Sequence, residues 1–259
     1  MNPEYTGAGN MRAATVNLTI AGRKVRLQFN APTGPTAPVD LLPLFQSLAD
    51  TFIGIAVENA QAEGGAISCR KGCGACCRQL VPISEIEVEA IRRLVGTLPE
   101  PRRQEVIDRF TRARERLSEA GLLEVLRAPE QVTREEVRSL GDEYFRQGIP
   151  CPFLDGESCS IHADRPLVCR EYLVTSPAAN CAQPTAETVQ CVAMPVKMSR
   201  AIRHLDDGNP DASATWIPMI LALEWPQTDR NGATAPPGTV SIAKLFEQLT
   251  GKEVPEPDV

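Results

Sequence analysis

Nine cysteines in the 259-residue chain are the side chains best suited to chemistry, and seven of them fall into two short groups. The first group, Cys69–Cys77, has the spacing Cys-x3-Cys-x2-Cys-Cys, and the second spans Cys151–Cys169. Thiolates bind zinc tetrahedrally or hold iron in clusters that use four cysteines. Gly72 and Gly74 let the first loop curl so that its sulfurs converge. The predicted metal ligands are Cys69, Cys73, Cys76, Cys77, Cys151, Cys159 and Cys169.

Some members of this cysteine set are left open by the sequence. Neighbours such as Cys76 and Cys77 can rarely both reach one ion at good angles. One of them therefore bridges two metals, serves a second site or stays a reactive thiol. Cys181 and Cys191 lie in less constrained sequence, and they are either extra ligands or packing residues.

Charge and hydropathy exclude several classes of function. A net charge of −6 and a pI near 5.2 argue against a nucleic-acid partner, which requires a basic face. The apolar stretch Ile217–Trp225 is too short to cross a bilayer, and Met1–Asn10 does not resemble a secretory signal. We therefore predict a cytoplasmic protein with no membrane partner. In a reducing compartment, clustered cysteines more often bind metal than form disulfides.

Basic residues accompany the cysteines in this otherwise acidic chain. Four thiolates around Zn²⁺ leave a formal charge near −2, and a [4Fe–4S] cluster with four thiolates is similar. Neighbouring cations would lower thiol pKa values and offset that charge. The candidates are Arg70, Lys71, Arg78, Arg165 and Arg170.

The second cysteine group carries a more specific pattern. It reads Cys151-Pro-Phe-Leu, then Cys159-x-Ile, then Arg165-Pro-x2-Cys169-Arg-x-Tyr172. Together with the first group, this pattern resembles the YkgJ-type cysteine-cluster family, which is described as a zinc- or iron-chelating domain. The resemblance covers Cys69 to Tyr172 and implies that the seven cysteines above are shared. It also implies special roles, which we assign to cofactor binding, for Arg165, Arg170 and Tyr172, and a further special role for Pro166.

The sequence departs from the family pattern at one position, and one branch of the family suggests an activity. His162 stands where the family pattern usually has Tyr, so it is a ligand candidate beside a surface or packing role. One branch of the family, the flagellin lysine-N-methylases, methylates lysine with S-adenosylmethionine. This chain is shorter than those enzymes.

Hydrophobic periodicity predicts a mostly helical fold with a small N-terminal β-hairpin and cysteine-rich loops. Residues 16–29 alternate as a hairpin should, and helical spacing fills 40–63 and 101–120. Capping boxes at Ser84/Glu87 and Thr133/Glu136 predict two further helices. Short helices are predicted over 196–205, 216–223 and 240–249. The predicted division is a leader and hairpin (1–37), a cysteine-cluster domain (38–195, with a helical insert over 83–148), and a helical extension with a loose acidic tail (196–259).

Three functions fit these residues. The first is a metalloprotein that binds iron, favoured as a [4Fe–4S] cluster, or Zn²⁺, and acts in redox chemistry or metal handling. The second is a cluster-dependent enzyme of the lysine-N-methylase type with S-adenosylmethionine as cofactor. The spacing Cys69-x3-Cys73-x2-Cys76 equals that of radical S-adenosylmethionine enzymes, although the chain lacks their repeated βα units. The third is a structural zinc module that presents a surface to a protein partner.

Overall fold

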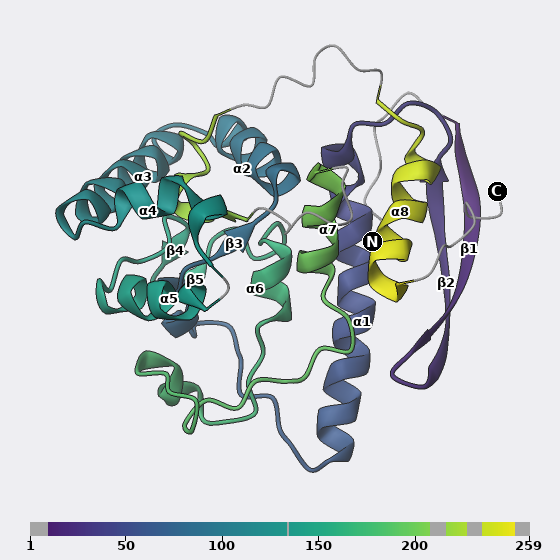
Figure 1. Ribbon diagram of the computed structural model, residues 1–259, viewed down its shortest axis with the longest axis horizontal. Coiled ribbons are helices and arrows are strands. Elements are labelled where there is room, and N and C mark those ends of the chain that lie inside the picture. Colours follow the sequence, from purple (N-terminus) through teal and green to yellow (C-terminus); the bar gives the residue numbers. More distant parts are fainter. Residues whose placement is uncertain (1–9, 134, 208–215, 227–234, 252–259) are drawn as a thin grey trace.

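The computed structural model describes residues 10–133, 135–207, 216–226 and 235–251. These residues form eight α-helices, an N-terminal hairpin and two very short strand pairs, which confirms the predicted mostly helical class (Figure 1). The sequence predicts a leader over residues 1–12 and a loose tail over 252–259. Residues 1–9 of that leader and the whole of that tail lie outside the described residues.

The hairpin consists of β1 (Met11–Ile20) and β2 (Arg23–Pro32), paired antiparallel with Ile20 opposite Arg23. Its turn is the dipeptide Ala21–Gly22, and both residues have positive φ (49° and 76°), as the tight turns favoured in hairpins require. The strands extend beyond the predicted 16–29. Met11 and Arg12, assigned by the sequence to the leader, pair with Pro32 and Ala31. Ala14 is buried, so the alternation of buried and exposed residues begins two positions before Val16, where the predicted strand starts.

Helix α1 (Leu42–Ala62) runs through the centre of the molecule and follows a 3₁₀ turn at Pro38–Leu41. The inner face of the hairpin, α7 (Met198–Asp207) and α8 (Gly238–Thr250) pack around it (Figure 1). This core unites residues from all three predicted segments, and the division at 37 and 195 stays a prediction. Its largest fully buried members are Phe45, Phe52, Phe246, Leu41, Leu167, Met198 and Ile202.

By length and composition alone, the stretch Pro38–Ala62 could cross a membrane, and among the described residues it is the one such helix. Half of its most apolar window is buried inside the protein. Helices buried in the core of a protein have the same composition, so this finding is weak evidence for a membrane-spanning helix. The absence of a membrane partner stays a prediction.

The predicted helical insert forms a separate layer, on the left of Figure 1. The Ser84 hydroxyl accepts from the Glu87 N–H at 3.2 Å, and the Glu87 carboxylate accepts from the Ser84 N–H at 2.9 Å. This confirms the first capping box. Thr133 and Glu136 exchange the equivalent bonds. The insert comprises α2 (Glu85–Thr97), α3 (Arg102–Glu119), α4 (Leu123–Arg127) and α5 (Glu136–Arg146).

One predicted helix is wrong. Residues 216–223 contain the strand β6 (Ile217–Pro218) followed by one 3₁₀ turn, Met219–Leu221. Strand β6 pairs antiparallel with β3 (Pro82–Ile83), and the pairing holds this apolar segment extended although its hydropathy suits a buried helix. The second cysteine region contains β4 (Leu154–Asp155), β5 (Ser158–Cys159) and α6 (Leu167–Glu171). The predictions over 196–205 and 240–249 are confirmed as α7 and α8.

Candidate metal centre

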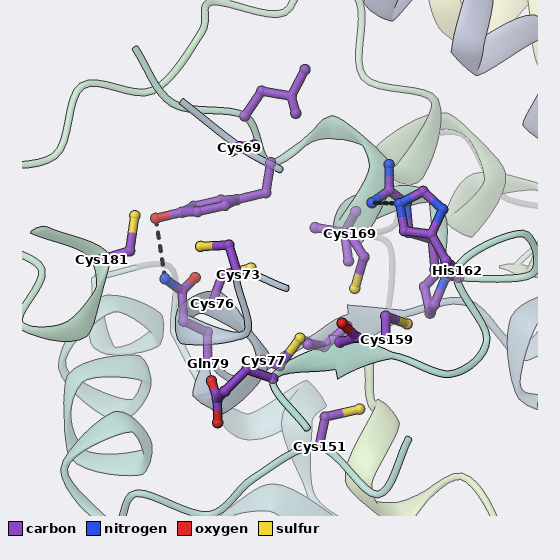
Figure 2. Close-up of a pocket in the computed structure, with 18 of the residues that line it drawn as sticks. Cys69, Cys73, Cys76, Cys77, Gln79, Cys151, Cys159, His162, Cys169 and Cys181 are labelled. Atoms are coloured by element: carbon purple, nitrogen blue, oxygen red, sulfur yellow. Dashed lines mark hydrogen bonds between the residues drawn. The ribbon is translucent and has the colours of Figure 1, made fainter. Parts of the chain in front are cut away.

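Eight of the nine cysteines line one cavity of about 560 Å³. They come from four separate parts of the chain, and Figure 2 shows the labelled cysteines around a common hollow. Cys181 lies on one side, Cys159 and Cys169 lie on the other, and Cys73 and Cys76 lie between them. Cys191 is exposed and is not among the lining residues. The cysteines that line the cavity are Cys69, Cys73, Cys76, Cys77, Cys151, Cys159, Cys169 and Cys181.

A backbone hydrogen bond joins the two cysteine loops directly. The N–H of Cys151 donates to the carbonyl of Cys77 at 2.7 Å. Beside it, the Arg78 guanidinium donates to both carboxylate oxygens of Glu157 at 2.7 and 3.1 Å. A Cβ on Gly74 would lie 2.6 Å from a Glu157 carboxylate oxygen and 3.1 Å from the Glu157 Cα. Glycine at position 74 therefore allows the two loops to approach this closely.

The first loop is a succession of tight turns. The N–H of Cys73 donates to the Arg70 carbonyl at 3.2 Å, and Gly72 between them has φ +85°. A 3₁₀ turn, Ala75–Arg78, follows, in which the N–H of Cys77 donates to the Gly74 carbonyl at 3.0 Å. These turns bring the cysteines of residues 69–77 to the same cavity.

Helix α6, which carries Cys169, is tied at its start to the insert and at its end to α7. Its first N–H, on Leu167, donates to the buried carboxylate of Glu87 at 2.8 Å. At its last residue, the Glu171 carboxylate accepts from the N–H and hydroxyl of Ser199 at 2.9 and 2.5 Å. Five residues are too few for a helix to be stable alone, so these bonds fix the position of Cys169.

Comparison with known families matches residues 68–192 to the model named CxxCxxCC, described as "Putative zinc- or iron-chelating domain". The matched residues, 68–192, are called the CxxCxxCC domain, after this model. The match is consistent with the YkgJ-type resemblance. It extends beyond Tyr172 and takes in both Cys181 and Cys191, which the sequence had left open. Comparisons with curated proteins and with solved structures find no match.

Arg165 brings a buried donor to the cavity of the CxxCxxCC domain. Its Nη1 lies 2.9 Å from Nε2 of His162, while its Nε is buried and has no hydrogen-bond partner in the described part of the chain. A buried donor without a partner is costly. An anionic thiolate centre in the cavity would supply the missing acceptor. The guanidinium of Arg165 also lowers the pKa of the exposed His162.

The other two predicted cofactor-binding residues differ in position. Tyr172 lines the cavity, its hydroxyl accepts from Gln79 Nε2 at 3.1 Å, and burial raises its pKa to about 12. Arg170 is buried but is not among the described residues that line the cavity. Its guanidinium bonds instead to Asp50 and to the carbonyls of Ala163 and Arg165. The cofactor-binding role stays a prediction for all three, and the cavity geometry favours it for Arg165 and Tyr172.

The donor set of the domain fits zinc or iron, since both are bound by thiolates. In this structure, no three His, Cys, Asp or Glu side chains among the described residues converge closely enough to hold one ion. The sulfurs surround a cavity whose volume is in the range of small-molecule pockets, about 300–1,000 Å³.

The metal-free domain should lose stability at alkaline pH. Burial raises the pKa of the Cys151 thiol from 9.0 to about 12, and burial also raises the pKa of Cys69, Cys159 and Cys169. The folded state therefore keeps protons that the unfolded chain releases. The stabilisation is complete below pH 9 and is lost as the pH rises from 9 to 12. Between these pH values the Cys151 thiol contributes a slope of about 1.4 kcal/mol per pH unit.

Urea unfolding of the metal-free protein at pH 8 and pH 10.5 measures this loss. A Cys151→Ser variant should show a smaller loss over the same interval, because it removes one of the shifted thiols. Equal stability of the original protein at both pH values would contradict the assignment.

Proposed function

We propose that the CxxCxxCC domain binds iron as a thiolate-held iron–sulfur centre, with a [4Fe–4S] cluster as the favoured form. The observation that carries this proposal is the ring of eight cysteines around one cavity. A structural zinc ion needs four ligands, so a single zinc would leave half of these thiols unused. The volume of the cavity also favours a centre larger than one ion. A cytoplasmic location, where thiols stay reduced, is part of the proposal.

The residues around the cavity have separable roles in this proposal. The thiols of the two loops and of α6 hold the metal. Arg165 contributes a positive charge and an unpartnered donor, which offset the negative charge of a thiolate centre. Apolar side chains that flank the paired strands β3 and β6 limit access of water, because Val81, just before β3, and Met219, just after β6, line the cavity. An iron–sulfur cluster bound there would supply one-electron redox chemistry.

Elemental analysis after oxygen-free purification tests the identity of the metal. Iron with acid-labile sulfide, a brown colour and a broad visible band are expected. A colourless protein with stoichiometric zinc would overturn the iron proposal and favour the structural zinc module. The methylase-type alternative requires S-adenosylmethionine as well, and calorimetric titration of the reconstituted protein would detect its binding.

Cysteine variants test whether the ligands lie at the cavity. We expect Cys159→Ser to lower bound metal and the melting temperature, because Cys159 lines the cavity. Cys191→Ser is the matched control, since its thiol is exposed and outside the cavity lining. Metal content and melting temperature of both variants would be measured after identical anaerobic reconstitution. Equal losses in the two variants would show that the site extends beyond the cavity.

A further inference from the structure

We propose that the cavity holds two metal centres side by side, bound at one end by Cys69, Cys73 and Cys181 and at the other by Cys151, Cys159 and Cys169, with Cys76 shared between them. This inference deepens the proposed function and rests on it for the presence of bound metal. It adds Cys181 as a ligand and divides the cavity into two sites.

The first end of the cavity is formed by the first cysteine loop and the segment around Cys181. Cys181 is buried, at 3% exposure, in the 3₁₀ turn Ala178–Ala182, which lies against the 3₁₀ turn Ala75–Arg78. Its thiol interacts electrostatically with the thiols of Cys69 and Cys73. Figure 2 shows Cys181 on the side of Cys73 that faces away from Cys159. Three thiols from two segments therefore gather at this end.

The second end is formed by the other cysteine group. Cys159 is the last residue of β5, and Cys169 lies in the middle of α6. The thiol of Cys169 interacts electrostatically with those of Cys151 and Cys159, and the thiols of Cys151 and Cys159 interact with each other. These three side chains come from three different local structures, and all of them line the cavity. A second set of three thiols is thus gathered on the side opposite Cys181.

Cys76 lies between the two sets. It lines the cavity, and Figure 2 shows it between Cys181 on one side and Cys159 and Cys169 on the other. With Cys76 shared, each end has four sulfur ligands, the number that both tetrahedral zinc and iron–sulfur clusters use. Cys77 also lines the cavity and is then left over. This arrangement resolves how two adjacent cysteines can serve one cavity.

The surroundings agree with two centres. Seven thiolates and two divalent ions carry a net charge of about −3, which a cation near both ends would partly offset. Arg165 interacts electrostatically with Cys69 at one end, with Cys159 at the other, and with Cys76 between them.

Zinc stoichiometry of the 259-residue chain tests this division. The metal-free protein would be loaded with Zn²⁺ alone under reducing, oxygen-free conditions, desalted, and analysed for zinc per chain. We expect two zinc ions in the original protein, one in Cys181→Ser and one in Cys159→Ser. Cys191→Ser is the control and should retain two zinc ions, because Cys191 is outside the cavity lining. Cys77→Ser tests the arrangement itself, which leaves the Cys77 thiol unused and therefore predicts two zinc ions in this variant. Cys76→Ser should lose tight binding at both ends.

The outcomes separate this inference from the iron proposal. One zinc per chain in the original protein, or two in Cys181→Ser, would overturn the two-centre arrangement whatever the native metal is. Conversely, two zinc ions with the expected losses would support it even if purification yielded no iron. Circular dichroism establishes that each variant is folded. If Cys76→Ser does not fold, a Cys159→Ser/Cys181→Ser double variant replaces it, and tight binding of even one zinc ion by that variant would overturn the proposal.

Discussion

Replacing Glu87 by Ala is expected to lower the free energy of unfolding by about 3–4 kcal/mol. The Glu87 carboxylate is buried and accepts from the N–H and hydroxyl of Ser84 and from the N–H of Leu167. Its loss leaves two backbone donors without acceptors inside the protein. The variant should also bind less metal, because the Leu167 bond holds the first turn of the helix that carries Cys169.

Two other substitutions sharpen this test. Glu89→Ala on the same helix is the matched control, since the Glu89 side chain is 53% exposed and pairs with Arg93 at the surface. It should change stability by less than about 0.5 kcal/mol.

Burial raises the pKa of Glu87, so Glu87→Gln, which keeps an acceptor without the charge, should destabilise the protein less than Glu87→Ala. Urea unfolding and metal analysis give both readouts. Equal midpoints for the two alanine variants would contradict the role assigned to Glu87.

Replacing Arg170 by Ala is expected to cost about 2–4 kcal/mol. The Arg170 side chain is 7% exposed, and its Nε donates to the Arg165 carbonyl at 3.1 Å while Nη2 donates to the Ala163 carbonyl. These bonds hold the loop before α6 against the guanidinium of Arg170. Arg170→Lys should recover little of the loss, because an ammonium cannot reproduce the planar fork.

The ion pair between Arg170 and Asp50 is expected to contribute less than these carbonyl bonds. The Asp50 side chain is 56% exposed, and exposed ion pairs contribute about 0–1 kcal/mol. Asp50→Asn should therefore be a mild variant in thermal unfolding. A loss as large as that of Arg170→Ala would instead make the ion pair the main contribution of Arg170.

Local patterns predicted much of the fold. Alternation located the hairpin, and the stripe of Val106, Phe110, Ala113 and Leu117 located α3, since each pattern reports burial on one face. The capping box at Ser84 located the start of α2. Helix α4 and strand β6 were missed because five and two residues are too few for a periodic pattern. Their conformation depends on contacts distant in the sequence, and for β6 these include its pairing with β3.

The candidate site shows the same limit. Spacing grouped seven cysteines correctly around one cavity, because close spacing within each loop keeps their sulfurs together. Spacing could not show whether Cys181 is a ligand or a packing residue. Its position in the cavity lining depends on how the turn Ala178–Ala182 folds back against the first loop. Arg165 and Arg170 looked equivalent in the sequence. The fold places Arg165 at the cavity and engages Arg170 in structural bonds, and no local pattern distinguishes the two.

The pairing of β3 with β6 has a consequence for biosynthesis. Ile217 comes 134 residues after its partner Ile83, which directly follows the first cysteine loop. At translation rates of 5–20 residues per second, a ribosome needs about 7–27 s to make this interval. During that time the cysteines of the first loop have already been synthesised, whereas β6, the strand that pairs with β3, has not. Delivery of metal is therefore expected to follow translation of β6, and a nascent chain stalled before residue 217 should not retain metal tightly.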